Sequence, residues 1–293
     1  MSVRFPFSAG TAAAGTPLPA GACDCHIHVY DGQIPAAAGS SLRPPDASIG
    51  EYRRVQQRMG TQRVVLVTPS TYGADNRPML AGLSPLGAQG RGVAVITGQE
   101  RMDELEALHE QGVRGVRINL SLGVLHQASD IDTLAQRIAP LGWHLQLLMP
   151  LEQLTLLADR LRALPVQLVF DHFGRVTPKL CGQHPAHDLL LELLRARRAW
   201  IKLSGGYLVS PMHCSEDPQL LPLARSFIDA APDRVVWGSD WPHATASAGH
   251  HPMPDDAAQI DALARWAGDA QQLQQILVDN PQKLYGFGPL TEN

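Results

Sequence analysis

The chain has 293 residues, of which 44% are hydrophobic, so it can bury the core of one barrel-sized domain or of two smaller ones, and we expect one. Its formal net charge of -4 gives no electrostatic case for a nucleic-acid partner, which leaves small molecules as the expected ligands. The four cysteines, at positions 23, 25, 181 and 214, form neither a paired zinc motif nor a dense disulfide framework. We therefore expect reduced thiols and a cytoplasmic protein without a membrane span, because no apolar run approaches about 18 residues.

Residues 1–21 are rich in Ala, Gly, Pro and Ser, and their apolar stretch is too interrupted for a signal-peptide core, so we expect a flexible or loosely packed arm. Residues 22–293 alternate short β-branched runs with longer helical stretches. The predicted strands are Ala22–His28, Arg63–Ser70, Gly92–Gly98, Val113–Leu120, His144–Met149, Val166–His172, Trp200–Ser204 and Arg234–Asp240. The predicted helices are Ile49–Met59, Met102–Gln111, Ile131–Ala139, Leu151–Ala163, His187–Arg198, Gln219–Ala230 and a terminal pair from Asp255.

This alternation is typical of strand–helix units around a parallel sheet. About eight units in one domain predict an α/β fold of the (β/α)8 TIM-barrel type, in which the chemistry lies at the carboxyl ends of the strands. An open doubly wound sheet is the alternative, and it would ordinarily carry a glycine-rich phosphate loop after the first strand. The residues at 29–33, Val-Tyr-Asp-Gly-Gln, do not form such a loop.

The first predicted strand carries a His-x-His pair. Alternation along an extended strand predicts that Asp24, His26 and His28 share one face, with Cys25 on the other. Two imidazoles at the mouth of a barrel can hold a metal ion or polarise a substrate oxygen. The competing interpretation is that both are surface or hydrogen-bonded core histidines.

The fourth and sixth predicted strands also end in polar groups. Arg117 and Asn119 alternate with aliphatic residues, so we expect both to point inward. An inward arginine indicates either an anionic ligand or a structural pair with a barrel carboxylate. His172 places a third imidazole at the mouth, and Gly174 allows the chain to turn there.

The last two predicted strands supply a candidate base. Lys202 and Ser204 are expected to point inward, and the loop that follows carries Tyr207 over the site. Asp240 stands at the tip of the eighth strand on the same face as Gly238, where its carboxylate can act as a base. An N-cap role for the next helix is the alternative for Asp240.

The fifth predicted strand ends in Leu148 at its inward tip, so no fourth imidazole reaches the mouth. This argues against a two-metal site. A single Zn²⁺ or Mn²⁺ ion would have His26, His28 and Asp240 as its ligands.

Together these residues resemble the amidohydrolase superfamily, and within it the branch of 2-pyrone-4,6-dicarboxylate lactonases and sugar-lactone hydrolases and isomerases. The matching runs extend from residue 22 to 287, and the ordered set is specific for the family although any one run is weak. They are Asp24-x-His26-x-His28, residues 71–76, residues 112–119, residues 142–144, residues 170–174, residues 202–205 and residues 237–243.

The resemblance implies a hydrolase of a cyclic ester that works without a divalent metal. On this pattern His26, His28 and His172 hydrogen-bond the lactone carbonyl, and Asp240 is the general base for water. Arg117 would bind a substrate carboxylate, and we expect Ser70, Asn119 and Tyr207 to bind the substrate with it.

The chain departs from the branch pattern only at substrate anchors. The second arginine of the pattern is replaced by Gly123, its tyrosine by Leu148, and its last arginine falls near Tyr207 and Leu208. We therefore expect a lactone with one carboxylate or similar anionic group. Arg43 is a candidate replacement cation, although a solvated loop arginine is the favoured interpretation.

Three other functions stay open on the sequence. The first is a mononuclear Zn- or Mn-dependent amidohydrolase or decarboxylase. The second is a sugar-acid lactone isomerase, in which a substrate hydroxyl replaces water. The third is a small-molecule binder without catalysis, which we disfavour because buried imidazoles and a carboxylate are costly without a use. The sequence does not predict an oligomeric state.

Overall fold

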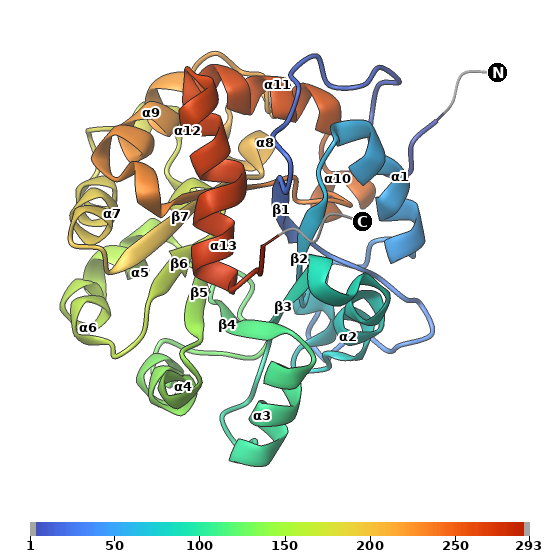
Figure 1. Cartoon of the computed structure of the whole chain (residues 1–293). Coiled ribbons are helices and arrows are strands. Elements are labelled where there is room, and N and C mark those ends of the chain that lie inside the picture. Colours follow the sequence, from blue (N-terminus) through green and yellow to red (C-terminus); the bar gives the residue numbers. More distant parts are fainter. Residues whose placement is uncertain (1–3, 290–293) are drawn as a thin grey trace.

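The computed structural model describes residues 4–289, and in these residues eight parallel strands form one sheet in the order β1 to β8. Helices surround the strands (Figure 1). The strands are β1 (Cys23–Ile27), β2 (Arg63–Val67), β3 (Gly90–Ala94), β4 (Val113–Asn119), β5 (His144–Leu148), β6 (Leu168–Phe170), β7 (Ala199–Ser204) and β8 (Val235–Gly238).

The ring is closed just beyond the ends of β1 and β8. The Asp240 N–H donates to the His26 carbonyl at 2.9 Å, and the His28 N–H donates to the Trp241 carbonyl at 2.8 Å. The predicted (β/α)8 barrel is confirmed, and these two bonds bring the first and last strand ends of the chain side by side.

The helices fall largely where the sequence predicts them. They are α1 (Ile49–Met59), α2 (Arg77–Leu83), α3 (Met102–Glu110), α4 (Asp130–Ile138), α5 (Leu151–Leu156), α6 (Ala158–Ala163), α7 (Pro185–Arg195), α8 (Gly206–Val209), α9 (Leu220–Ala230), α10 (Ala244–Ser247), α11 (Asp256–Ala267), α12 (Ala270–Gln274) and α13 (Asn280–Tyr285). The helix α1 begins with a capping box, in which Ser48 and Glu51 each accept a hydrogen bond from the other's backbone N–H. The predicted helix over 151–163 is instead two helices that meet at Leu157, and three helices rather than a pair follow Asp255. The helices α2, α8 and α10 were not predicted.

The interior of the barrel is packed with side chains. Inward residues such as Val65, Trp200 and Val236 form one buried cluster with Tyr285 and Phe287 from the end of the chain. The Tyr285 ring meets the His144 ring edge to face at 5.4 Å between centroids. The end of α13 and the residues that follow it therefore fill the amino-terminal end of the barrel, opposite the end where a TIM barrel carries its chemistry.

The expected placement of Asp24 and Cys25 is wrong, because the pairing of β1 with β2 is irregular between Asp24 and Ile27. The Asp24 carboxylate accepts hydrogen bonds from Tyr52 of α1 at 2.9 Å and from the Ser239 hydroxyl at 2.6 Å. Cys25 instead joins the inner cluster of the barrel. An extra residue in the strand thus keeps both His26 and His28 inside while it turns Asp24 outward.

The described part of the amino-terminal segment, residues 4–21, makes specific contacts with the barrel. Arg58 of α1 donates to the carbonyls of Ala9 and Ala12 at 2.7 and 2.6 Å. The Thr16 backbone N–H and hydroxyl both donate to Asp261 of α11 at 2.8 Å. These bonds fix a segment for which the sequence predicts only a loose arm.

All four cysteines are free thiols. Within residues 4–289, no helix has both the length and the apolar character that crossing a membrane requires.

Candidate active site

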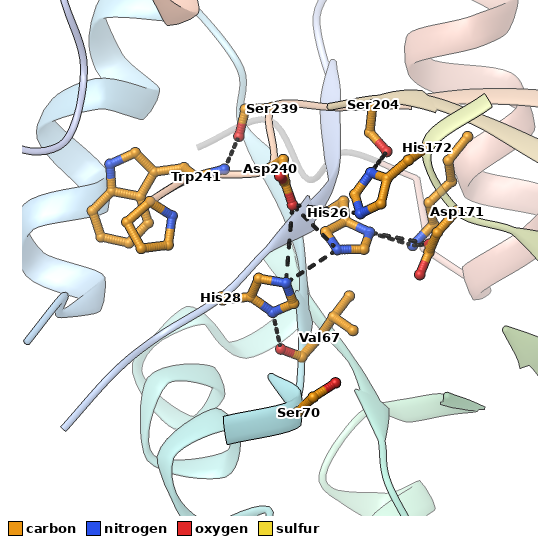
Figure 2. Close-up of polar contacts among 12 residues, drawn as sticks. His26, His28, Val67, Ser70, Asp171, His172, Ser204, Ser239, Asp240 and Trp241 are labelled. Atoms are coloured by element: carbon orange, nitrogen blue, oxygen red, sulfur yellow. Dashed lines mark hydrogen bonds and ion pairs between the residues drawn. The ribbon is translucent and has the colours of Figure 1, made fainter. Parts of the chain in front are cut away.

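A cavity of about 330 Å³ opens at the carboxyl ends of the strands. Seven of the eight residues that the sequence predicts for the site line it, and they are His28, Ser70, Arg117, Asn119, His172, Tyr207 and Asp240. The eighth, His26, is fully buried, and its ring lies between those of His28 and His172 (Figure 2). The structure therefore brings together the predicted candidate residues from β1, β4 and the loops that follow β2, β6, β7 and β8.

Asp240 lies at the centre of three imidazoles (Figure 2). Its Oδ1 atom is 3.6 Å from Nε2 of His26, 3.9 Å from Nε2 of His28 and 3.8 Å from Nε2 of His172. The three rings thus present the same nitrogen to one carboxylate oxygen. Such an arrangement can move protons and stabilise negative charge at a single point.

The close approach of β8 to β1 depends on Gly238. A Cβ atom at this position would lie 2.7 Å from the backbone nitrogen of His26, which is nearer than real contacts allow. Two residues later Asp240 has φ of 71°, a left-handed conformation that non-glycine residues rarely adopt. The backbone is therefore held in an uncommon conformation where it presents the candidate base.

A left-handed turn after β6 presents His172. Residues 172–175 have φ angles of 50°, 56°, 59° and 65°, so four consecutive residues are left-handed. Gly174 lies inside this turn, and a Cβ atom there would come within 2.4 Å of Leu190 Cδ1. The sequence signal for a turn at Gly174 was correct, but its handedness and length were not predicted.

The tautomer of His28 follows from its neighbour. Its Nδ1 lies 2.7 Å from the Val67 carbonyl oxygen, which can only accept, so Nδ1 carries a proton. Burial lowers the pKa of His28 to about 4, and the ring is therefore neutral at neutral pH. Nε2 of His28 then has no proton, and its lone pair faces the site.

The tautomer of His26 is the opposite one. Lys202 Nζ, which has only donors, lies 3.2 Å from Nδ1 of His26. Nδ1 of His26 also lies 3.2 Å from Oδ1 of Asp171, an acceptor, so the two neighbours compete for this nitrogen. Burial lowers the pKa of His26 well below its usual value, so the ring is neutral. The unprotonated Nε2 of His28 is an acceptor next to Nε2 of His26 and favours the tautomer with the proton on Nε2. This N–H points at Nε2 of His28 at 3.3 Å, and the two tautomers are mutually consistent. A chain of donors thus runs from Lys202 through His26 and His28 to the carbonyl of Val67.

The tautomer of His172 is not fixed by its neighbour. Its Nδ1 lies 2.9 Å from the Ser204 hydroxyl, which can donate or accept. Burial lowers the pKa of His172, which favours the neutral ring. Nε2 of His172 is therefore available either as a donor or as an acceptor toward a ligand.

A buried carboxylate that the sequence analysis did not single out lies below these rings. Asp171 Oδ2 accepts from Arg117 Nε at 3.0 Å and from Gln146 at 3.1 Å, and Lys202 lies 3.6 Å from Oδ1. Burial favours the protonated acid, but His26, Lys202 and Arg117 hold the pKa of Asp171 well below its usual range. Asp171 alternates with inward Val169, so the parity used for the other strands could have found it.

The carboxylate of Asp240 is held on both sides. Oδ2 accepts a hydrogen bond from the Tyr207 hydroxyl at 2.7 Å, while Oδ1 faces the imidazoles. Burial acts to raise the pKa of Asp240, but the neighbouring imidazoles, with His172 first among them, lower it below the usual value. Asp240 is therefore an ionised carboxylate at neutral pH.

The remaining predicted residues form a polar wall. The Asn119 side-chain amide donates to the Ser70 hydroxyl at 2.8 Å, and both residues line the cavity. Arg117 uses only Nε for Asp171, and within residues 4–289 its terminal nitrogens make no hydrogen bond. These nitrogens are therefore available to an anionic ligand.

The spacing of the cluster also suits a metal ion. Nε2 of His26, Nε2 of His28 and Oδ1 of Asp240 lie within 4.8 Å of one another, and ligands about 2.0–2.1 Å from a tetrahedral zinc ion are about 3.4 Å apart. The hydrogen bond from Lys202 to Nδ1 of His26 works against binding, because it favours a proton on the Nε2 atom that would have to coordinate the ion, while Asp171 at the same distance from Nδ1 favours the opposite tautomer. The donor spacing therefore fits a single ion, and the tautomer of His26 does not.

The sequence pattern that defines amidohydrolases matches residues 23–287. The chain belongs to the amidohydrolase family. The family membership that the motifs imply is thus confirmed over nearly the whole barrel.

Several known proteins are similar to this amidohydrolase. The 2-pyrone-4,6-dicarboxylate hydrolase of Comamonas testosteroni is 35% identical and the match covers 92% of this chain and 91% of the relative. A 4-sulfomuconolactone hydrolase of Hydrogenophaga intermedia is 32% identical, with 92% of this chain and 90% of the relative covered. The crystal structure of a probable 2-pyrone-4,6-dicarboxylic acid hydrolase from Acinetobacter baumannii, with citric acid bound, is 27% identical and superposes with a TM-score of 0.79 over 91% of this chain and 100% of that chain.

Proposed function

We propose that the protein hydrolyses a small lactone that carries an anionic group, with Asp240 as the general base. One observation carries the proposal: an ionised carboxylate faces three Nε2 atoms inside a cavity of about 330 Å³ that Arg117 also lines. The relatives named as hydrolases of 2-pyrone-4,6-dicarboxylate and 4-sulfomuconolactone support a cyclic ester as the substrate.

In the first step Oδ1 of Asp240 takes a proton from water while the water oxygen attacks the lactone carbonyl carbon. The carbonyl oxygen gains negative charge and accepts hydrogen bonds from Nε2–H of His26 and from Nε2 of His172 in its donor tautomer. The ring C–O bond then breaks, the carboxyl group forms, and the departing oxygen takes the proton from Asp240. The product is an open-chain hydroxy acid or its keto form.

His28 has a different part from the one that the resemblance implies. In its neutral form Nε2 has no proton, because Nδ1 donates to Val67. We assign it to accept the His26 N–H in the resting site and to accept a hydrogen bond from the attacking water during reaction. Two imidazoles, rather than three, then act as donors to the carbonyl oxygen.

The substrate anion is assigned to Arg117. Its Nε is fixed on Asp171, which orients the plane of the guanidinium and leaves the terminal nitrogens for a bidentate contact with a carboxylate or sulfonate. Ser70 and Asn119, joined by a hydrogen bond at 2.8 Å, add neutral donors and acceptors on the same wall of the cavity.

We propose that the reaction proceeds without a divalent metal ion. Lys202 lies 3.2 Å from Nδ1 of His26 and favours the tautomer with the proton on Nε2, the atom that would have to coordinate the ion. The alternative, favoured by the donor spacing alone, is one Zn²⁺ or Mn²⁺ ion held by His26, His28 and Asp240. Such an ion would polarise the carbonyl or lower the pKa of bound water.

A panel of five- and six-membered lactones with zero, one or two carboxylates tests the proposal, assayed with and without a chelator. We expect turnover of anionic lactones to survive chelation and to fall about 10²–10⁴-fold in Asp240→Asn. The matched control is Asp229→Asn, an exposed aspartate in α9. Loss of turnover on chelation, restored by zinc, would replace the metal-free proposal with the alternative.

Water labelled with heavy oxygen separates hydrolysis from ring isomerisation. Hydrolysis places one labelled oxygen in the new carboxyl group, because the attacking oxygen comes from water. Isomerisation through a substrate hydroxyl incorporates none, so an unlabelled product would overturn the hydrolase assignment.

A further inference from the structure

The base segment, residues 239–243, is fixed to β1 on both sides of Asp240. Asp240 donates its N–H to the His26 carbonyl at 2.9 Å, and the carbonyl of Trp241, the next residue, accepts from the His28 N–H at 2.8 Å. The backbone of Trp241 therefore sets the position of the base relative to two of the imidazoles. A displacement of about 1 Å in a catalytic group can lower the rate about 100-fold, so the contacts that hold Trp241 bear on the proposed reaction.

The amino-terminal segment holds the indole of Trp241. The Nε1–H group donates to the Pro6 carbonyl at 2.9 Å, and the Phe7 ring packs edge to face on the indole at 5.6 Å between centroids. The ring of Tyr52, from α1, lies 5.4 Å from the indole. Trp241 is fully buried, and its ring lies on the side of the base segment away from the imidazoles (Figure 2). The indole thus connects a remote part of the chain to the base.

A second path joins the amino-terminal segment to the base through α11. His243 donates its N–H to the Asp240 carbonyl at 2.7 Å, and Nε2 of His243 lies 3.1 Å from Oδ1 of Asp256 at the start of α11. The Asp256 N–H in turn donates to the Ser8 hydroxyl at 3.2 Å. His243 and Asp256 are both fully buried, so solvent does not compete for these contacts. Residues 6–8 therefore contact the base segment both before and after its turn.

The amino-terminal segment follows a defined path over the barrel. Phe7 has φ of 51°, a left-handed conformation that is rare for an aromatic residue, so the surrounding contacts must hold it there. Gly10 has φ of 70°, and a Cβ atom at this position would clash with the Asp255 carboxylate. None of residues 4–21 lines the cavity. These residues can therefore affect the reaction only through the side chains and backbone that they contact.

We propose that Trp241 is a positioning residue for Asp240 and that residues 6–8 hold it in place, so that the amino-terminal segment contributes to catalysis from outside the cavity. This inference rests on the proposed lactonase function and extends it to a segment for which the sequence predicts only a loose arm. When the segment is loosened, the base moves, which weakens interactions made in the transition state more than it weakens substrate binding. The competing explanation is that residues 6–8 only stabilise the fold by burying the indole.

Kinetics of two matched variants separates these explanations. Phe7→Ala removes the ring that packs on Trp241, whereas Phe5→Ala removes a ring of the same segment that lies over the Arg58 guanidinium at 4.9 Å. We expect Phe7→Ala to lower kcat about 10- to 100-fold with KM within about twofold, and Phe5→Ala to leave both constants within about twofold. Phe7→Leu keeps an apolar side chain against the indole and should retain kcat within about threefold. Equal losses of kcat in Phe5→Ala and Phe7→Ala would overturn the proposal.

Amide hydrogen exchange reports the position of the base segment without turnover. The N–H groups of His28, Asp240 and His243 make the three backbone bonds described above. We expect each of them to exchange about tenfold faster in Phe7→Ala than in wild-type protein, because the base segment opens locally more often. The Asp171 N–H, which donates to the Leu147 carbonyl on the other side of the barrel mouth, should keep its wild-type rate. Faster exchange at all four amides alike would indicate a loss of general stability and overturn the proposal.

Ser8→Ala tests the second path even if Phe7→Ala folds poorly. It removes the acceptor of the Asp256 N–H, so we expect faster exchange at His243 and a loss of kcat of about 3- to 10-fold. If both variants keep wild-type kcat while wild-type protein hydrolyses lactones, the positioning role falls and the proposed function stands. If Phe7→Ala speeds exchange at Asp240 but wild-type protein hydrolyses no lactone, the contact that positions Asp240 stands and the lactonase function falls.

Discussion

The hydroxyl of Tyr207 lies 2.7 Å from Oδ2 of Asp240, on the carboxylate oxygen that does not face the imidazoles. The sequence predicts Tyr207 as a substrate-binding residue. The structure gives it a second contact, because its hydroxyl donates to the proposed base while the residue also lines the cavity. A phenol in this position stabilises the ionised carboxylate and fixes its orientation.

Replacement of Tyr207 by Phe should shift the acidic limb of the kcat/KM pH profile to higher pH. The variant loses a hydrogen bond to the charged form of Asp240, so the pKa of this carboxyl rises and protonation inactivates the base sooner as pH falls. At pH 8 we expect a loss of less than about tenfold. Tyr72→Phe is the control, because that hydroxyl contacts the backbone of Asp31. An unchanged profile would separate Tyr207 from the base.

Replacement of Lys202 by Met should strengthen zinc binding. The side chain of Lys202 places a donor 3.2 Å from Nδ1 of His26 and so keeps the proton on Nε2. Without it, Nδ1 can donate to Asp171 Oδ1, which lies 3.2 Å away, and Nε2 becomes a free ligand. We expect zinc affinity, measured by competition with a chelating dye, to rise at least about tenfold.

Two further measurements test the prediction for Lys202→Met. Nitrogen NMR of labelled histidine reports the His26 tautomer directly and should show its inversion in the variant. Breaking the buried pair with Asp171 should also lower the free energy of unfolding by about 3–5 kcal/mol. Zinc affinity that stays at the wild-type value would contradict the role assigned to Lys202.

Stability should rise with pH between about 4 and 6.5. Burial lowers the pKa of His28 to about 4 and that of His144 to about 3, so in this window the unfolded chain binds more protons than the folded one. Burial raises the pKa of Asp24 to about 6, which acts in the opposite direction, because the folded carboxyl keeps a proton that the unfolded one releases. The lowered pKa values of His26 and His172 act in the same direction as those of His28 and His144. Four histidines outweigh one aspartate, and we expect a net slope of at least about 1 kcal/mol per pH unit.

Urea unfolding at a series of pH values measures this slope. His144→Gln removes one of the titrating groups at the closed end of the barrel, away from the proposed chemistry, and should flatten the curve. His250→Gln, at an exposed position, should leave it unchanged. A stability that is flat or falls over this range would contradict the burial of neutral imidazoles.

Gly174→Ala should be more destabilising than Gly182→Ala. Both glycines have positive φ, 59° and 68°, so both substitutions incur the cost of a left-handed alanine, about 1–2 kcal/mol. Only at Gly174 does the new Cβ meet a neighbour, Leu190 Cδ1 at 2.4 Å, while Gly182 has nothing within 4 Å. We expect an additional loss of about 1–3 kcal/mol in chemical denaturation for Gly174→Ala. Equal losses would show that the turn can relax away from Leu190.

Strand parity predicted much of this site. Alternation on β4 correctly predicted inward Arg117 and Asn119, which both line the cavity. These predictions succeed because a regular strand has a fixed period of two. Gly238 does not leave space below Asp240, because the backbone and Cβ of His26 lie against it.

Parity fails where the backbone departs from that period. The irregular pairing in β1 turned Asp24 outward, and the left-handed turn brought Arg175 into the cavity three residues after His172. The irregular pairing in β1 has no local sequence signal, and Gly174 indicates only that the chain turns, not the hand or the length of the turn. The tautomers of His26 and His28 likewise depend on Lys202 and Val67, which are distant in the chain.

Tyr285 and Phe287 close the amino-terminal end of the barrel. Because this end of the barrel is filled, we expect the substrate, the attacking water and the product of the proposed reaction to pass through the cavity at the carboxyl ends of the strands. In the proposed hydrolysis the acid product carries one more negative charge than the ester, so we expect Arg117, which lines the cavity, to slow release of the acid more than opening of the ring.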